Sequence, residues 1–145
     1  MTADEFEPWK TVFLRDWAED LARADDLAPA DAAMRAEQDL EAQLPDGAGT
    51  KDHFLFVLLD GARRVGTLWY SVDGEGQAFL DDVTIEPSER RKGHGRQALA
   101  LLEADARARG CERIALNVYG HNPGAQALYE AAGYLTKRRE MAKRL

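Results

Sequence analysis

The sequence lacks the features that mark disulfide-bonded, membrane-spanning or metal-binding proteins. Among its 145 residues Cys111 is the only cysteine, so no internal disulfide is possible, and we expect it to fill space rather than act as a catalytic thiol. No run approaches about 18 apolar residues and no basic-then-apolar leader opens the chain, which predicts a cytoplasmic protein without a membrane partner. No cluster of cysteine, histidine and acidic residues has metal-ligand spacing, so we expect no metal.

Charge is spread unevenly along the chain, whose net charge is −7. Residues 1–52 hold 14 acidic and 5 basic side chains, whereas residues 86–145 hold 7 acidic and 12 basic ones. The acidic total argues against nucleic acid as the principal partner. The basic final third suits a polyanionic cofactor. The acidic first third either attracts a cationic acceptor or is simply a solvated surface.

Hydrophobic periodicity divides the chain into a helical first third and a part that is rich in strands. Apolar residues spaced by three and four from Phe6 to Leu21 predict one helix, and a weaker stripe predicts a second helix over 29–44. Strands are expected at 53–59, 64–72, 77–86, 113–119 and 134 to about 141, and helices at 94–109 and 122–132. This order predicts a single α+β domain over residues 1–145, with helices flanking a mixed, mostly antiparallel sheet.

A basic, glycine-containing turn stands between the strand predicted at 77–86 and the helix that follows it. Helix starts carry unpaired N–H groups and a partial positive charge, and glycines allow backbone amides to approach a phosphate closely. Residues 90–96 hold four basic side chains and two glycines. The sequence therefore predicts a site for a ligand that bears phosphates.

Three kinds of phosphate-bearing ligand bind to glycine-containing turns of this type. The P-loop pattern GxxxxGK[ST] is absent, which argues against a nucleoside triphosphatase. Gly93-x-Gly95-x-x-Ala98 fits the dinucleotide fingerprint, but that motif belongs at the first βα turn of a large doubly wound sheet, and fewer than 50 residues follow it here. The third ligand is coenzyme A.

Two segments resemble the signatures of one enzyme family. Arg90-x-x-Gly93-x-Gly95 is similar to [QR]-x-x-G-x-[GA] of the GNAT family of N-acetyltransferases, and residues 122–134 resemble that family's N-x-x-A-x-x-L-Y-x-x-x-G-[FY] segment. The resemblance covers about residues 53–145. It implies acetyl-CoA-dependent transfer to a primary amine. Family members usually open with a β-strand, for which this chain has almost no residues, so we expect that strand to be short or missing.

The resemblance also assigns residues to the coenzyme. Backbone groups of the strand predicted at 77–86 are expected to meet the pantetheine arm, and the basic turn is expected to meet the pyrophosphate. The residue at the start of the helix predicted at 122–132 is expected to cap that helix and to lie near the coenzyme. These residues are Val83, Thr84, Ile85, Arg90, Arg91, Lys92, Gly93, His94, Gly95, Arg96 and Asn122.

Two residues are candidates for proton transfer. Tyr129 occupies the family's tyrosine position, and the resemblance implies that its hydroxyl protonates the departing sulfur. Alternation along the strand places Asp81 in an apolar row with Val83, and Asp82 on the opposite side. Desolvation in such a row raises a carboxyl pKa, so Asp81 is the predicted base. The alternative is that Asp81 is only a polar residue at a β-bulge.

The acceptor and the assembly state are less constrained. The acidic first third favours a cationic small molecule as the amine acceptor, while a protein N-terminus or lysine stays open. An acyl-CoA-binding or regulatory module without catalysis is the alternative from another class. Without a first strand, the sheet edge near residues 51–59 would be open, which predicts a homodimer through the N-terminal side.

Overall fold

The computed structural model describes residues 1–143 and 145 of the chain. The elements are α1 (Ala3–Asp25), α2 (Pro29–Gln43), a 3-10 turn (Gly47–Gly49), β1 (His53–Asp60), β2 (Arg63–Val72), β3 (Gln77–Ile85), a second 3-10 turn (Pro87–Glu89), α3 (His94–Ala108), β4 (Arg113–Leu116) and α4 (Pro123–Ala131). The sheet order is β1-β2-β3-β4, with β4 parallel to β3 and the other pairs antiparallel. The predicted α+β class with a mostly antiparallel sheet is confirmed.

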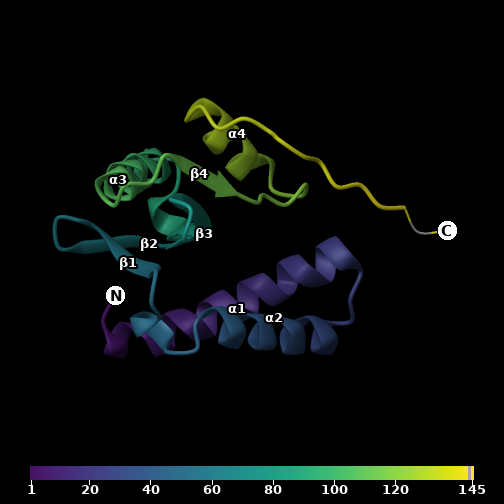
Figure 1. The fold of residues 1–145 in the computed structure, drawn as a ribbon. Coiled ribbons are helices and arrows are strands. Elements are labelled where there is room, and N and C mark those ends of the chain that lie inside the picture. Colours follow the sequence, from purple (N-terminus) through teal and green to yellow (C-terminus); the bar gives the residue numbers. More distant parts are fainter. Residues whose placement is uncertain (144) are drawn as a thin grey trace.

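Helices cover both faces of the sheet, as Figure 1 shows: α1 and α2 lie on one side and α3 on the other. The molecule has one hydrophobic core on each face of the sheet, and alternating residues of β2 contribute to both. Tyr70 packs with Leu99 of α3 on one face, whereas Trp69 packs with Trp9 and Leu40 on the other. Trp69 is 2% exposed and Tyr70 is fully buried. Burial of each ring contributes about 3 kcal/mol to stability. None of the described helices is long and apolar enough to cross a membrane.

Among the described residues no strand precedes α1, in agreement with the expectation that the family's first strand is short or missing. Helix α1 starts at a capping box, in which the Glu5 amide donates to Thr2 Oγ1 at 3.3 Å and the Thr2 amide donates to the Glu5 carboxylate at 2.7 Å. The Met1 amine donates to the Leu55 carbonyl at 2.7 Å, so the first residue occupies one acceptor of β1. A dimer through this side stays a prediction.

Two strand predictions near the C-terminus are wrong. Strand β4 ends at Leu116 rather than at residue 119, and the described residues after α4 form no strand. This segment runs away from the body of the molecule in Figure 1. Residues with a high β-propensity do not form a strand by themselves, because a strand also needs a neighbouring strand with which it can pair.

Strands β2 and β3 approach each other closely at Gly66, which pairs with Ile85. A Cβ atom at Gly66 would lie 2.2 Å from the Thr84 carbonyl oxygen. Any side chain there would push the end of β3 away from β2. Glycine is therefore required at this position. The close pairing that it allows fixes the position of the end of β3, which leads into the basic turn.

Candidate active site

A β-bulge in β3 determines where the two neighbouring carboxylates point. Leu80 pairs with Tyr70 and Asp82 pairs with Trp69, so Asp81 is an extra residue without a partner on β2. Because Asp82 stands opposite Trp69, its side chain is on the α1 face. The Asp81 carboxylate meets the side chain of Ser71, which lies two positions from Trp69 on β2 and so on the α1 face. The prediction that Asp81 shares a face with Val83 is wrong, since Val83 packs against the core under α3. The bulge interrupts the alternation on which that prediction rested.

Both carboxylates ionise at unusually high pH. Burial raises the pKa of Asp82 to about 7. A hydrogen bond from the Thr84 hydroxyl at 3.2 Å opposes the rise, whereas the negative charges of Asp16, Asp81 and Asp20 add to it. Burial also raises the pKa of Asp81 to about 6, opposed by the Ser71 hydroxyl. One carboxylate oxygen of Asp81 is buried and has no hydrogen bond to any described residue.

Helix α4 brings Tyr129 to the same region. The helix starts at Asn122, whose side-chain oxygen accepts from the Ala125 amide at 3.1 Å, with Pro123 at its first position. Burial, together with the charge of Asp82, raises the pKa of Tyr129 to about 12. Tyr129 therefore stays protonated at neutral pH and can donate a proton. Tyr129 packs against the same core under α3 as Val83, the residue after Asp82 in β3.

Strand β3 has an open edge beside these groups. Its parallel pairing with β4 begins at Gln77–Arg113 and ends at Leu80–Leu116. Beyond Leu80, β3 continues to Ile85 while β4 has ended, so the backbone of residues 81–85 faces no strand on that side. An extended ligand with amide groups can pair with such an edge. Val83, Thr84 and Ile85, the residues predicted to meet the pantetheine arm, lie here.

The basic turn leads from this edge into α3. Arg91 and Gly93 have positive φ angles of 62° and 88°, and Gly93 is the N-cap residue of α3. These angles turn the chain so that the first amides of the helix point out of its N-terminus. A Cβ atom at Gly95 would lie 3.1 Å from Leu128 of α4, so the glycine lets the turn approach that helix.

The buried carboxylate of Glu89 holds the basic turn in place through contacts with its basic side chains and with β2. It is 7% exposed and lies 3.4 Å from Arg63, 3.2 Å from Lys92 and 3.4 Å from His94 Nε2. Burial alone would raise the pKa of Glu89, but the Lys92 hydrogen bond and the cations around it hold it below its ordinary value. The His94 contact lacks hydrogen-bond geometry, since that nitrogen has no hydrogen-bond partner in the described chain.

The basic residues of the turn consequently divide into two groups. Arg90 donates to the Ile85 carbonyl at 3.1 Å, and Lys92 is paired with Glu89. These two side chains brace the loop. Arg91 and Arg96 are exposed and form no ion pair within the described part of the chain. They are the side chains that are free to meet phosphates.

The loop that joins β4 to α4 is tied to α1 across the site. Trp17 donates to the Tyr119 hydroxyl at 3.3 Å, and His121 Nε2 lies 2.7 Å from an Asp20 oxygen. The Tyr119 and His121 rings stack at 5.1 Å, and Gln126 donates to the Tyr119 carbonyl. Residues that are about a hundred positions apart in the sequence therefore meet at this loop.

Sequence reasoning missed Glu89, His121 and the acidic side of α1. Asp16 and Asp20 lie one helical turn apart, which places them on one side of α1, and the charge of both reaches Asp82. The i,i+4 spacing was visible in the sequence, but the partner strand was not. The Glu89–Lys92 spacing of three was visible in the sequence, but the pairing of Glu89 with Arg63 at the start of β2 was not.

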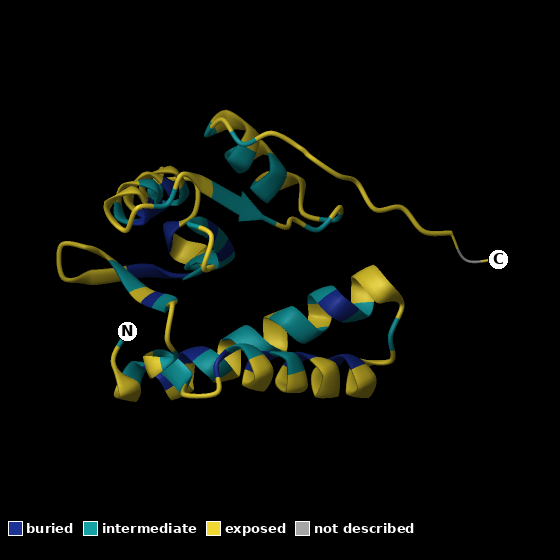
Figure 2. Ribbon diagram, in the orientation of Figure 1, coloured by how far each residue is buried: buried dark blue, intermediate teal, exposed yellow. Residues whose placement is uncertain are grey.

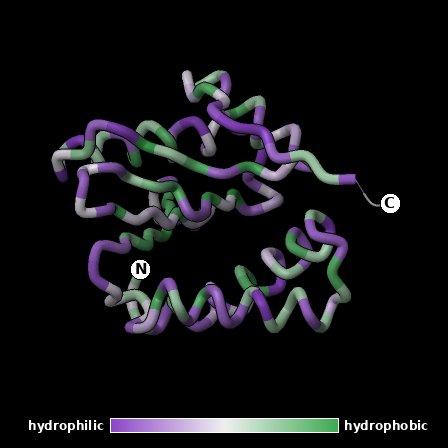
Figure 3. Tube along the Cα trace, turned by 45° about the vertical axis from the view of Figure 1, so that its right-hand side comes forward, coloured by the Kyte–Doolittle hydropathy of each residue, from purple (hydrophilic) through white to green (hydrophobic). Residues whose placement is uncertain are grey.

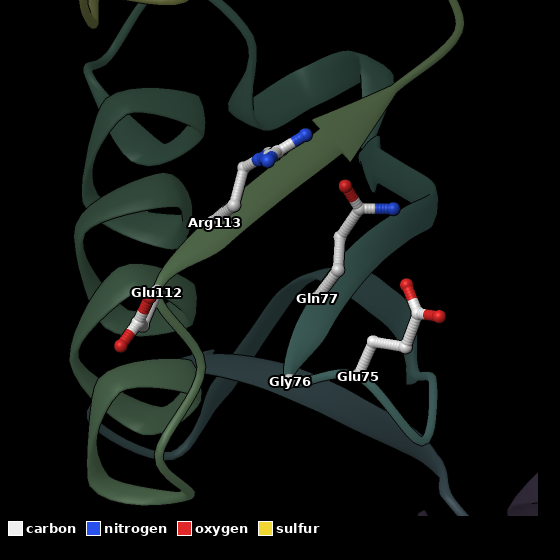
Figure 4. Close-up of a pocket in the computed structure, with 5 residues that line it drawn as sticks. All are labelled: Glu75, Gly76, Gln77, Glu112 and Arg113. Carbon is white, nitrogen blue, oxygen red and sulfur yellow. The ribbon is translucent and has the colours of Figure 1, made fainter.

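Figure 4 shows a separate cavity of about 240 Å³. It lies at the first residues of β3 and β4 and is lined by Glu75, Gly76, Gln77, Glu112 and Arg113. Asp82 stands further along β3, past the last pair that β3 makes with β4. The cavity therefore does not include the two carboxylates or Tyr129. No group of three or more described side chains could hold a metal ion.

Comparison with known proteins extends these observations. The sequence model of the acetyltransferase (GNAT) family matches residues 7–134. The uncharacterized N-acetyltransferases YycN and YdgE of Bacillus subtilis are 34% and 30% identical to the chain over 149 aligned positions, which cover 100% of this chain and 96% and 95% of theirs.

Solved structures of acetyltransferases also resemble this chain. The crystal structure of Bacillus subtilis YycN has a TM-score of 0.95 at 33% identity and is covered over 95% of its length by 100% of this chain. Aminoglycoside N-acetyltransferase AAC(6')-Iy in complex with CoA shares only the fold, with a TM-score of 0.59 at 22% identity over 75% of this chain and 90% of that one. With a family match over most of its length and a full-length relative above 30% identity, the chain belongs to the GNAT family of N-acetyltransferases and is an acyltransferase.

Proposed function

We propose that the protein transfers an acetyl group from acetyl-CoA to a primary amine of a cationic small molecule. The observation that carries the proposal is the electrostatic coupling of Tyr129 to Asp82 beside the open edge of β3, next to the basic turn. An acid, a base, an edge for an amide-bearing ligand and an anion site are thereby grouped in one region. Tyr129, Asp81 and the coenzyme-binding residues predicted from the sequence are candidates within it.

The residues present fit coenzyme A. The edge at Val83 and Thr84 offers backbone groups that face no described strand, and Ile85 ends this edge with its carbonyl bonded to Arg90. The absence of a side chain at Gly95 leaves room at the helix start. Arg91 and Arg96 would supply positive charge for the phosphates, while Gly93, His94 and Asn122 shape the backbone around them. Arg90 and Lys92 act indirectly, because they hold the turn in place.

Acetyl-CoA, when bound, supplies an acyl carbon that is already activated as a thioester. Transfer exchanges a C–S bond for a C–N bond, so the amine must lose one proton and the sulfur must gain one. An alkylamine with an ordinary pKa of about 10.4 is neutral in only about one part in a thousand at pH 7. Asp82 is favoured as the proton acceptor because it is the carboxylate that is coupled to Tyr129. Tyr129 would protonate the sulfur.

The acceptor class follows from the charges around Asp82. Asp16 and Asp20 of α1 act on Asp82 from across the site, and Trp17 and Tyr119 add aromatic surface beside them. An acceptor that carries a second cationic group would be attracted by Asp16 and Asp20 while its reacting amine meets Asp82. A protein N-terminus or lysine side chain is the alternative acceptor, and a coenzyme-binding module without catalysis is the alternative function.

A panel of amines tests the proposal. The protein is incubated with acetyl-CoA, and free thiol is followed with a colorimetric reagent for polyamines, aminoglycosides, amino acids and lysine peptides. We expect amine-dependent thiol release that is largest for acceptors with two or more cationic groups. Thiol release only with peptides would favour a protein acceptor. Coenzyme binding without thiol release for any amine would favour the binding module.

Gly95→Glu is expected to abolish coenzyme A binding, because it places a negative charge in the first turn of α3 where the phosphates would dock. The fold should survive, since the first contact of the new side chain is the flexible end of Leu128 and an acidic residue suits a helix N-terminus. Calorimetric titration measures the loss. Gly95→Gln, which has nearly the same size but no charge, is the control and should bind more tightly than Gly95→Glu. Normal binding by Gly95→Glu would show that the phosphates dock elsewhere.

A further inference from the structure

Helix α4 carries the candidate acid Tyr129 but contributes only partly buried side chains to the core under α3. None of its residues is buried, whereas α1, α2 and α3 each have three or more buried residues. Figure 2 shows the contrast, with dark blue on α1 and only teal and yellow on α4. The described residues after Tyr134 are exposed and run away from α4 in Figures 1 and 3. Contacts outside the core therefore contribute a large share to the position of Tyr129.

The first of these contacts join α4 to the loop that precedes it. Gln126 Nε2 donates to the carbonyls of Tyr119 and Gly120 at 3.1 and 3.3 Å. The Asn122 amide donates to the same Tyr119 carbonyl at 3.0 Å, and the Asn122 side chain caps α4. The loop and the first turn of α4 are consequently one bonded unit.

A second set of contacts attaches this unit to α1. Trp17 Nε1 donates to the Tyr119 hydroxyl at 3.3 Å, and His121 Nε2 lies 2.7 Å from Asp20 Oδ1. Trp17 and Asp20 are three positions apart in α1, so both contacts are on one side of that helix. The Tyr119 and His121 rings stack with an interplanar angle of 15°, which links the two contacts to each other.

These contacts connect the surroundings of the candidate acid with those of the candidate base. Asp20 is one of the residues whose charge raises the pKa of Asp82, while the loop that Asp20 holds begins the helix of Tyr129. Tyr129 lies seven positions after Asn122, which is about two helical turns, so a shift of the loop carries the hydroxyl with it. A displacement of about 1 Å at a reacting group can lower a rate about 100-fold.

We infer that Tyr119 and His121 are positioning residues for acetyl transfer, which fix α4 against α1 so that the Tyr129 hydroxyl meets the departing sulfur. The inference rests on the proposed function, in which Tyr129 protonates that sulfur. The side chains of Tyr119 and His121 are engaged with α1, so they act through Tyr129 rather than on the reacting atoms.

Four substitutions in the loop separate the contacts. Tyr119→Phe removes the hydroxyl that accepts from Trp17 and keeps the ring. His121→Phe removes the contact with Asp20 and keeps a ring that can stack on Tyr119, whereas His121→Gln keeps an N–H donor and is the conservative variant. Val118→Ala is the control, because Val118 is 39% exposed in the same loop and its side chain cannot hydrogen-bond to α1.

Hydrogen exchange tests the attachment without any activity measurement. In the double variant Tyr119→Phe/His121→Phe, the amides of residues 126–132 should exchange about tenfold faster than in the wild type, as expected when two hydrogen bonds are lost. The amides of α3 should keep their rates, and Val118→Ala should match the wild type throughout. Unchanged exchange at residues 126–132 would overturn the inference. Equally faster exchange in every helix would also overturn it, since it would show a general loss of stability.

Kinetics tests whether the attachment acts through Tyr129. The double variant should lower kcat about tenfold and change the KM for acetyl-CoA less than about twofold, and His121→Gln should keep most of the activity that His121→Phe loses. In a Tyr129→Phe background, the same double substitution should lower kcat no further. Equal reductions in both backgrounds would overturn the inference and leave the role of Tyr129 as the acid intact. A Tyr129→Phe variant with the wild-type rate would contradict the proposed function itself, and the inference with it.

Discussion

Tyr129→Phe is expected to lower the rate of acetyl transfer by about 10²–10⁴-fold, the range typical of a general acid–base group. The affinity for acetyl-CoA should change little, because the ring and its packing in the core under α3 are retained. The physical reason is the pKa of Tyr129, which burial raises to about 12 and which keeps the hydroxyl protonated at neutral pH. Steady-state kinetics combined with a coenzyme titration separates the rate effect from the binding effect.

Tyr134→Phe provides the matched control. It removes the same atom from a ring that lies 5.9 Å from Tyr129, and the hydroxyl that it removes has no hydrogen-bond partner in the described structure. We expect the rate to stay within a few-fold of the wild-type value and the stability to be equal or slightly higher. An unchanged rate in Tyr129→Phe would mean that water protonates the sulfur. Equal losses in both variants would indicate a packing effect.

Asp82→Asn is expected to lower the rate about 10²–10³-fold at neutral pH, with the loss becoming smaller as the pH rises. The variant keeps an oxygen that can accept the Thr84 hydrogen bond, so the strand should keep its geometry. Recovery at high pH is expected because the fraction of neutral amine in solution rises with pH and the base is then less needed. In the wild type, the rate should rise through the pKa of Asp82 at about 7.

Asp81→Asn is the comparison that assigns the base. Asp81 is the extra residue of the bulge and also has a raised pKa, of about 6, but no coupling to Tyr129. If Asp82 is the base, Asp81→Asn should show a smaller loss without recovery at high pH. A larger loss in Asp81→Asn that high pH reverses would make Asp81 the base, as the sequence predicted.

Asp82→Asn should also stabilise the folded protein at alkaline pH. The pKa of Asp82 is raised from 3.8 in the unfolded chain to about 7 in the folded one, so the native state binds the proton more tightly. The stability linked to this group is complete below pH 4 and is lost as the pH rises through about 7. Asp82→Asn should therefore gain up to about 4 kcal/mol at pH 8 and little at pH 4, measured by denaturant unfolding. A constant difference at both pH values would contradict the raised pKa.

Local sequence signals were sufficient for features that are built within one segment. The helix stripe of α1, the glycines of the basic turn and the asparagine cap of α4 each depend on neighbours within a few positions. The positive φ angle at Gly93 and the Asn122 cap are local devices of this kind. The family signatures could be located for the same reason, and with them the residues expected to bind the coenzyme.

Tertiary structure decided the features that depend on a partner elsewhere in the chain. Alternation within β3 predicted opposite faces for Asp81 and Asp82, but the register with Trp69 and Tyr70 makes Asp81 the extra residue of a bulge. The pKa of Asp82 depends on Asp16 and Asp20 of α1, and the turn depends on Glu89 and Arg63. The segment after residue 134, expected to be a strand, pairs with no strand in the described part of the chain. A sequence specifies local conformation directly, whereas pairing, burial and charge coupling exist only once distant segments have met.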